Sequence, residues 1–185
     1  MKFDRGLIIA LSFVLLSLGS ATYVSLAALN YLRLYPALDE MQNQMPYQVD
    51  KLSFVAGANY NESTLTAQIS VSNPSDYSGF RLRTVSLSLF LYDQANRSIT
   101  LFSTPNVLDA SQTVQGQLGP HAVDSITLAV PLTSDQARQI VSFDNSYSGN
   151  VMGEVNLRID IVTFLVPVTG SVAFTRIQDV ALSSN

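Results

Sequence analysis

The residue types that carry most enzymatic chemistry are sparse in this sequence of 185 residues, which has no cysteine and one histidine. Without cysteine there can be no disulfide, no thiolate catalysis and no cysteine-bound zinc. The histidine, His121, follows Pro120 in an expected surface loop and cannot hold a metal alone. Lys2 and Lys51 are the only lysines, so no serine has an evident activating partner. We predict no enzyme and no cofactor.

The carboxylates are dispersed along the chain, and no D-x-D-x-D-G calcium loop, P-loop, dinucleotide fingerprint or G-x-S-x-G motif occurs. Arg158 and Asp160 point to the same side of an expected strand, where they should form a solvent-exposed ion pair. Weak calcium binding by acidic loops stays an alternative, but no small-molecule substrate is indicated. The aspartates weighed as ligands are Asp76, Asp93, Asp109, Asp124, Asp135, Asp144, Asp160 and Asp179.

Two triplets, Asn61-Glu62-Ser63 and Asn96-Arg97-Ser98, match the acceptor pattern of N-linked glycosylation. Both fall in turns or at the ends of expected strands. Asn61 and Asn96 are therefore candidate glycosylation sites if the domain faces the outside of a glycosylating organism.

Charged residues make up 13% of the chain, about half the usual share of a soluble domain. The net charge is -4, and no basic stripe is present, so nucleic-acid binding is not expected. From Gly6 to Leu32 there is no charged residue at all. As a helix, this run would be about 40 Å long, enough to span a bilayer.

The flanking charges give the expected orientation of this span. Lys2 and Arg5 precede it, whereas Asp39 and Glu40 follow, so residues 1–5 should be cytoplasmic and the rest of the chain outside. We predict a single-pass cell-membrane protein whose residues 6–35 contact lipid. Pro36 should end or kink the helix, leaving 36–48 as a linker or short amphipathic helix.

Two other interpretations of the N-terminal segment remain open. Gly19 and Ala21 suit the -3 and -1 positions of a signal peptide cleaved before Thr22. The run Asp4-Arg5-Gly6-Leu7-Ile8 resembles the processing site of archaeal type IV pilins, where cleavage would follow Gly6.

One face of the span carries only small residues at spacings of four, four and three. Small side chains let membrane helices approach closely, so this face could pack on a protein partner or on a second copy of the chain. The four residues are Ser17, Ala21, Ser25 and Ala28.

From about Val49 the apolar period changes from helical to two, which is typical of strands with one buried face. The clearest alternating runs are 65–71, 85–91, 126–130 and 155–161, with shorter ones at 52–58, 98–102 and 164–177, where Gly170 breaks the last. Residues 103–123 show no clear period, and we expect a long loop there with at most one edge strand. Thr133 and Gln136 form a capping box that predicts a helix over 134–143.

This pattern predicts an all-β fold, an antiparallel β-sandwich of seven to eight strands with one short helix, over 49–179, followed by a tail at 180–185.

The stretch AQISVSNPSDYSGFRLRTVSLSLFLYD, in which Asn73-Pro74 ends a strand before a polar turn, resembles the late embryogenesis abundant type 2 family, or WHy domain. LGPHAVDSITLAVPLTSDQARQIV and GEVNLRIDIVTFLVPVTGSVAF resemble that family's strand–helix unit and closing strand pair. The resemblance covers about 50–178 and implies an immunoglobulin-like sandwich without catalytic residues. It also implies a membrane-anchored surface protein linked to stress tolerance. Asn73 and Pro74 would be structural, since proline stops the strand and the asparagine side chain can bond nearby backbone.

Three functions remain open at this point. The first is a non-catalytic structural or interaction module at the cell surface. The second is a pilin-like filament subunit processed after Gly6, and the third is an accessory subunit of a membrane complex.

Overall fold

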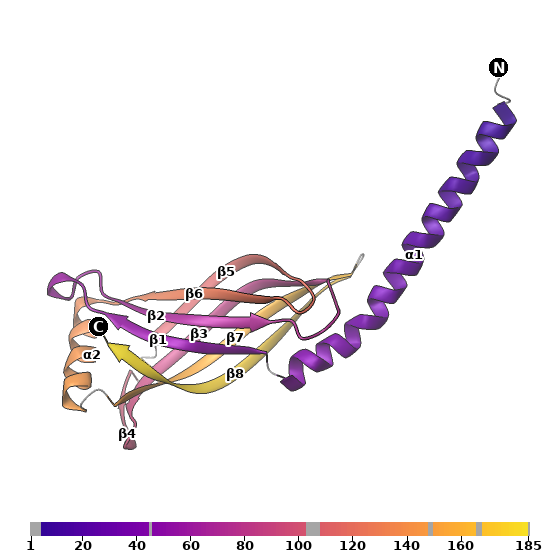
Figure 1. Cartoon of the computed structure of the whole chain (residues 1–185). Helices are drawn as coiled ribbons and strands as arrows, with labels where there is room; N and C mark the ends of the chain where they lie inside the picture. The colour runs from indigo at the N-terminus through magenta and orange to yellow at the C-terminus, as the bar shows by residue number, and fades with distance from the viewer. Residues whose placement is uncertain (1–4, 45, 103–107, 148–149, 166–167, 185) are drawn as a thin grey trace.

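A computed structural model describes residues 5–44, 46–102, 108–147, 150–165 and 168–184 (Figure 1). A long N-terminal helix precedes a strand-rich domain that carries one short helix. The elements in chain order are α1 (Arg5–Gln44), β1 (Tyr47–Val55), the 3-10 turn η1 (Ala58–Tyr60), β2 (Thr64–Ser72), β3 (Phe80–Asp93), β4 (Asn96–Leu101), β5 (Leu108–Leu118), β6 (Val123–Pro131), α2 (Ser134–Ser146), β7 (Val151–Leu165) and β8 (Val168–Ser184).

The eight strands form one curled, mixed sheet in the order β4-β3-β7-β8-β1-β2-β6, with β5 also paired to β3. Most pairs are antiparallel, but β1 and β8 run parallel, with Leu52 opposite Leu182. The sheet bends into a half-barrel (Figure 1). The prediction of a β-rich fold with eight strands and a short helix is confirmed, but the antiparallel immunoglobulin-like sandwich is not observed. Alternation of apolar residues predicts which face of a strand is buried, but it does not predict which strands pair or in which direction they run.

The buried face of the half-barrel is the one that alternation predicts. On β3 the buried side chains include Val85, Leu87 and Leu89, and on the neighbouring β7 they include Leu157 and Ile159. Val85 lies opposite Ile159 and Leu87 opposite Leu157, so these residues meet in register on the inner face. The residues that alternate with them point outward and form the outer surface of the domain.

Helix α2 begins where its capping box predicts. The Gln136 backbone N–H donates to Thr133 Oγ1 at 3.2 Å, and the Thr133 backbone N–H donates to Gln136 Oε1 at 2.9 Å. Ala137 and Ile140 are buried beneath the helix. Local sequence therefore predicted this element, although the helix ends three residues later than expected.

The strands differ from the prediction in three places. Residues 108–118, expected to be mostly loop, form β5, whose polar side chains hide its strand pattern. Gly170 lies inside β8, where Thr163 is its neighbour across the ladder, so the predicted break at Gly170 is wrong. Residues 180–184 of the expected tail are also part of β8, and the end of that strand pairs with β1.

Helix α1 does not end at Pro36 but continues to Gln44. Of the two alternatives for 36–48, a linker or a short amphipathic helix, the helical one therefore holds over most of that range. The helix bends in its last turns, next to the sheet (Figure 1). Leu34, Ala37 and Met41 are buried there and belong to the same apolar cluster as the strands. Their burial compensates for the backbone hydrogen bond that proline removes, which explains why the helix persists.

Candidate functional site

The residues singled out in the sequence lie in three separate places. Gly6 and the small-residue face (Ser17, Ala21, Ser25 and Ala28) lie on α1, and all five are exposed. α1 is long and apolar enough to cross a membrane, with a mean hydropathy of 1.9 in its most apolar stretch. Its exposed large side chains include Phe13, Leu16 and Val24. The face is therefore accessible for lipid or for another helix.

Asn73 is buried in the loop between β2 and β3, at the end of the half-barrel near the last turns of α1 (Figure 1). Its side-chain amide donates to the backbone carbonyls of Tyr77 at 2.7 Å, Gly119 at 3.0 Å and Leu118 at 3.2 Å. Its Oδ1 accepts from the Ser75 backbone N–H at 3.0 Å and from Ser75 Oγ at 2.7 Å. One side chain thus joins this loop to the β5–β6 turn, and its chemistry is structural.

The same loop buries Tyr77 completely, and its ring packs edge-on against Phe80 with 4.7 Å between centroids. Burial raises the pKa of Tyr77 above its usual 10.0. Its hydroxyl has no hydrogen-bond partner among the described residues. A Cβ at Gly79 would lie 2.3 Å from that oxygen, so glycine is required by the position of the tyrosine.

Both glycosylation candidates are exposed, at the end of the domain remote from the straight part of α1 (Figure 1). Asn61 follows η1, and its Oδ1 accepts a 2.8 Å hydrogen bond from Ser134 Oγ on α2. Asn96 opens β4, and its Oδ1 accepts from the Ser98 backbone N–H at 3.1 Å. The attachment of a glycan to either side chain stays a prediction.

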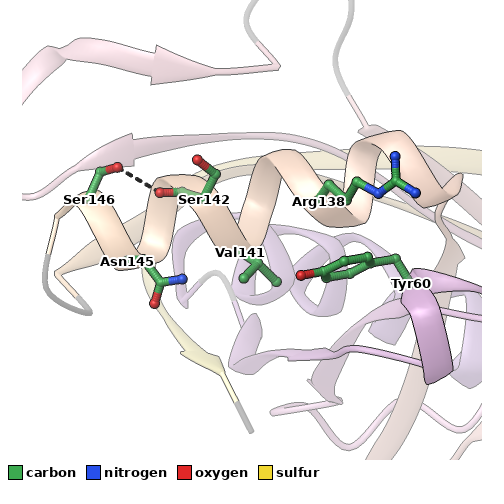
Figure 2. A pocket seen from close by; sticks show the side chains of 6 residues that line it. All are labelled: Tyr60, Arg138, Val141, Ser142, Asn145 and Ser146. Carbon is green, nitrogen blue, oxygen red and sulfur yellow. Dashed lines mark hydrogen bonds between the residues drawn. The ribbon is translucent and has the colours of Figure 1, made fainter.

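A shallow pocket of about 380 Å³ lies at this same remote end, between η1 and one face of α2 (Figure 2). It is lined by Tyr60, Arg138, Val141, Ser142, Asn145 and Ser146. The Arg138 guanidinium carbon is 5.8 Å from the centroid of the Tyr60 ring. We name this the distal pocket.

The loop that presents Tyr60 is strained, because Asn59, Tyr60 and Glu62 all have positive φ angles, between 54° and 65°. Such conformations cost free energy in residues other than glycine and concentrate at functional sites. Sequence reasoning missed the distal pocket because Tyr60 and Arg138 are far apart in the chain and match no motif.

A second group missed in the sequence is a charged cluster on the outer face. Glu154 on β7 lies directly opposite Asp179 on β8, and Arg97 from β4 forms ion pairs with both carboxylates. The Arg97 guanidinium also lies 4.9 Å from the centroid of the Tyr92 ring. Burial, and then a hydrogen bond to Asp179 and that residue's charge, raise the pKa of Tyr92, although Arg97 opposes the shift.

The remaining polar candidates are isolated. His121 is an exposed residue whose Nε2 lies 2.9 Å from Asp76 Oδ1. Arg158 and Asp160 form the expected surface pair at 3.2 Å. Within the described residues, no three His, Asp or Glu side chains group closely enough to hold a metal ion.

No family model matches the chain, and no curated protein matches it. Solved structures resemble it only loosely. An X-ray structure of the structural genomics target SoR45 has 10% identity and a TM-score of 0.41, covering 76% of this chain and 89% of that one. The solution structure of AT1g01470 from Arabidopsis thaliana has 16% identity and a TM-score of 0.39, covering 74% and 81%. A crystal structure of a protein from Archaeoglobus fulgidus has 9% identity and a TM-score of 0.37, covering 72% and 97%. These scores carry no functional argument.

Proposed function

We propose that the chain is a single-pass membrane protein whose β-domain acts as a non-catalytic structural or interaction module at the outer cell surface. The observation that carries this proposal is the dual surface of α1. Its first part exposes Phe13, Leu16 and other large apolar side chains, whereas Leu34, Ala37 and Met41 near its end are buried in the domain core. A helix built in this way suits an anchor joined firmly to the domain that it carries.

The anchor would hold the domain in a defined pose. Tyr31 and Tyr35 are exposed one turn apart, with ring centroids 5.8 Å apart, where the buried part of the helix begins at Leu34. Aromatic residues of this kind prefer the membrane–water interface. The interface would then lie near these rings, and the distal pocket would face away from the membrane.

An interaction role is supported by the chemistry at that far end. The distal pocket offers an aromatic ring, a guanidinium and an amide on a strained loop and an exposed helix face. Groups of this kind recognise a partner surface and supply no activated nucleophile. The resemblance to the late embryogenesis abundant type 2 family adds a role in stress tolerance to the proposal.

The pilin-like function is the second candidate, and one observation favours it. Gly6 lies in the first turns of α1, ahead of an exposed face of small residues that could pack in a filament core. A docked accessory subunit would use the same face.

The intact mass of the mature chain from membrane fractions separates these functions. The anchor proposal predicts a mass that retains residues 1–6 and a chain that resists extraction by alkaline carbonate. A mass beginning at Leu7 would overturn the anchor in favour of the filament subunit, and a mass beginning at Thr22 would indicate a cleaved signal peptide. For the accessory-subunit alternative, replacing both Ala21 and Ala28 with isoleucine should abolish co-purification of a partner, with Leu16→Ile as the control.

A further inference from the structure

The outward face of β3, β5, β7 and β8 carries a hollow of about 470 Å³ that no part of the proposed function uses. It is lined by Ser86, Leu87, Ser88, Asp109, Ala110, Ser111, Asn156, Arg158 and Thr175. We name it the outer-sheet hollow. Its walls are strands, which hold side chains more rigidly than loops do.

The strand register arranges the polar side chains in two adjacent rows. In one row, Ser111, Ser86, Arg158 and Thr175 follow one another across β5, β3, β7 and β8. In the next row, Asp109, Ser88 and Asn156 lie side by side on β5, β3 and β7. Neighbouring strands are about 4.8 Å apart, so each row offers a polar group at intervals close to the width of a sugar ring.

Five of these side chains have hydrogen-bonding groups that no atom of the described residues uses. Within the described ranges, the hydroxyls of Ser86, Ser88, Ser111 and Thr175 and the amide of Asn156 make no hydrogen bond to another residue. The Asn73 network and the charged cluster differ, because Asn73 and Arg97 are engaged by neighbouring groups. The outer-sheet hollow therefore gathers donors and acceptors that remain available to a ligand.

The charges of the hollow favour a neutral ligand. The Arg158 guanidinium is paired with Asp160, and Asp109 is the one further charged residue in the lining. Ile177 lies directly opposite Asn156 and is 65% exposed, which places an apolar side chain at the rim. The hollow thus combines many hydrogen-bonding groups with little net charge and an apolar edge. These properties suit a ligand with a hydroxylated rim and an apolar ring face.

We propose that the outer-sheet hollow binds a neutral oligosaccharide. Asn156 and Asp109 hold adjacent sugar hydroxyls, since a planar amide or carboxylate can bond two of them at once. The serines and Thr175 both donate to and accept from the remaining hydroxyls. Ile177 covers the apolar face of one ring. The inference is independent of the membrane anchor, because it uses only the outer face of the sheet.

The full chain in lipid nanodiscs can be titrated with cellohexaose, maltohexaose and hexa-N-acetylchitohexaose by calorimetry. We expect at least one of these neutral probes to bind, and Asn156→Ala and Asp109→Ala each to weaken it about tenfold, the loss of one or two hydrogen bonds. Asn43→Ala, which alters an exposed side chain on α1 outside both pockets, is the matched control and should leave the affinity unchanged.

Three results would overturn the proposal. The first is the failure of all three probes to bind at about 10 mM, a concentration that detects very weak sites. The second is equal affinity in the wild type and in both variants, with each variant shown to be folded by its thermal transition. The third is preferential binding of oligogalacturonate, because that probe is charged.

Discussion

The Asn73 side-chain amide donates a 2.7 Å hydrogen bond to the backbone carbonyl of Tyr77, and this contact closes the loop between β2 and β3. The same amide reaches the carbonyls of Leu118 and Gly119, so one buried side chain fixes two loops at once. The arrangement explains why an asparagine precedes Pro74 here, and it makes the stability of the domain depend on a single polar residue.

Replacing Asn73 with alanine should therefore destabilise the domain strongly. Several buried carbonyls and the Ser75 N–H would lose their partner, at a cost of about 3 kcal/mol. For a chain of this size, this cost corresponds to a fall in Tm of about 10 °C. Thermal unfolding of the full chain in detergent measures the change, and the exposed Asn145→Ala is the control. A fall no larger than that of the control would show that the network is dispensable.

Tyr77→Phe should leave stability unchanged or raise it, because the buried hydroxyl has no partner among the described residues.

The Tyr77→Phe variant should also lose less stability than the wild type at alkaline pH. Burial raises the pKa of Tyr77, so the folded state holds the proton more tightly than the unfolded state. The resulting stability is complete below about pH 10 and is lost as the pH rises through the higher folded value. Unfolding by urea at several alkaline pH values measures the effect, with the exposed Tyr35→Phe as control. A steeper alkaline loss in Tyr77→Phe than in wild type would contradict this account.

Met41→Ala should loosen the last turns of α1 from the domain. Met41 is fully buried, and its truncation should cost about 2–3 kcal/mol. Hydrogen exchange of residues 34–44 in nanodiscs should accelerate while exchange in β7 stays slow. Asn43→Ala, which alters an exposed side chain in the same turns, should change neither. Unaltered protection in Met41→Ala would mean that the helix and the domain are not packed as the structure shows.

Arg97→Gln should expose the repulsion between Glu154 and Asp179, which lie directly opposite each other on β7 and β8. Facing like charges destabilise a strand pair, and we expect a loss of about 1 kcal/mol at low ionic strength. The loss should shrink in high salt, because these side chains are partly exposed. Urea unfolding at two salt concentrations tests this, and Arg138→Gln, which removes a wholly exposed pair with Asp135, is the control. A loss that does not depend on salt would attribute the effect to packing on Tyr92.

Local signals predicted part of this fold, and long-range contacts explain the rest. The capping box of Thr133 and Gln136 predicts the start of α2 because both partners are three residues apart. Alternation predicts β3 and β7, whose buried faces are mostly apolar. Alternation does not locate β5 within 103–123, because most of this strand's side chains are polar and exposed while its backbone pairs with β3. The parallel contact of Leu52 with Leu182 joins nearly the two ends of the domain, and no local pattern encodes it.

For the candidate sites too, local motifs were visible in the sequence and long-range contacts were not. Asn73-Pro74 was visible as a motif, and the structure explains it through carbonyls more than forty residues away. Pro36 predicted an end or a kink of the helix, and the helix continues through it because Ala37 and Met41 are buried against the domain. The distal pocket and the charged cluster needed the sheet before Tyr60 could meet Arg138, or Arg97 could meet Asp179. The sequence gives the type of each residue, but only the folded structure gives its contact partners.

The orientation of the β-domain is the central claim, and the absence of cysteine makes it directly measurable. Single cysteines would be introduced as Ser146→Cys, exposed on α2, and as Phe3→Cys, ahead of the membrane span. A membrane-impermeant maleimide should label Ser146→Cys in intact cells and Phe3→Cys only after the membrane is permeabilised. Labelling of Phe3→Cys in intact cells, with Ser146→Cys protected until permeabilisation, would place the domain inside the cell and contradict the account.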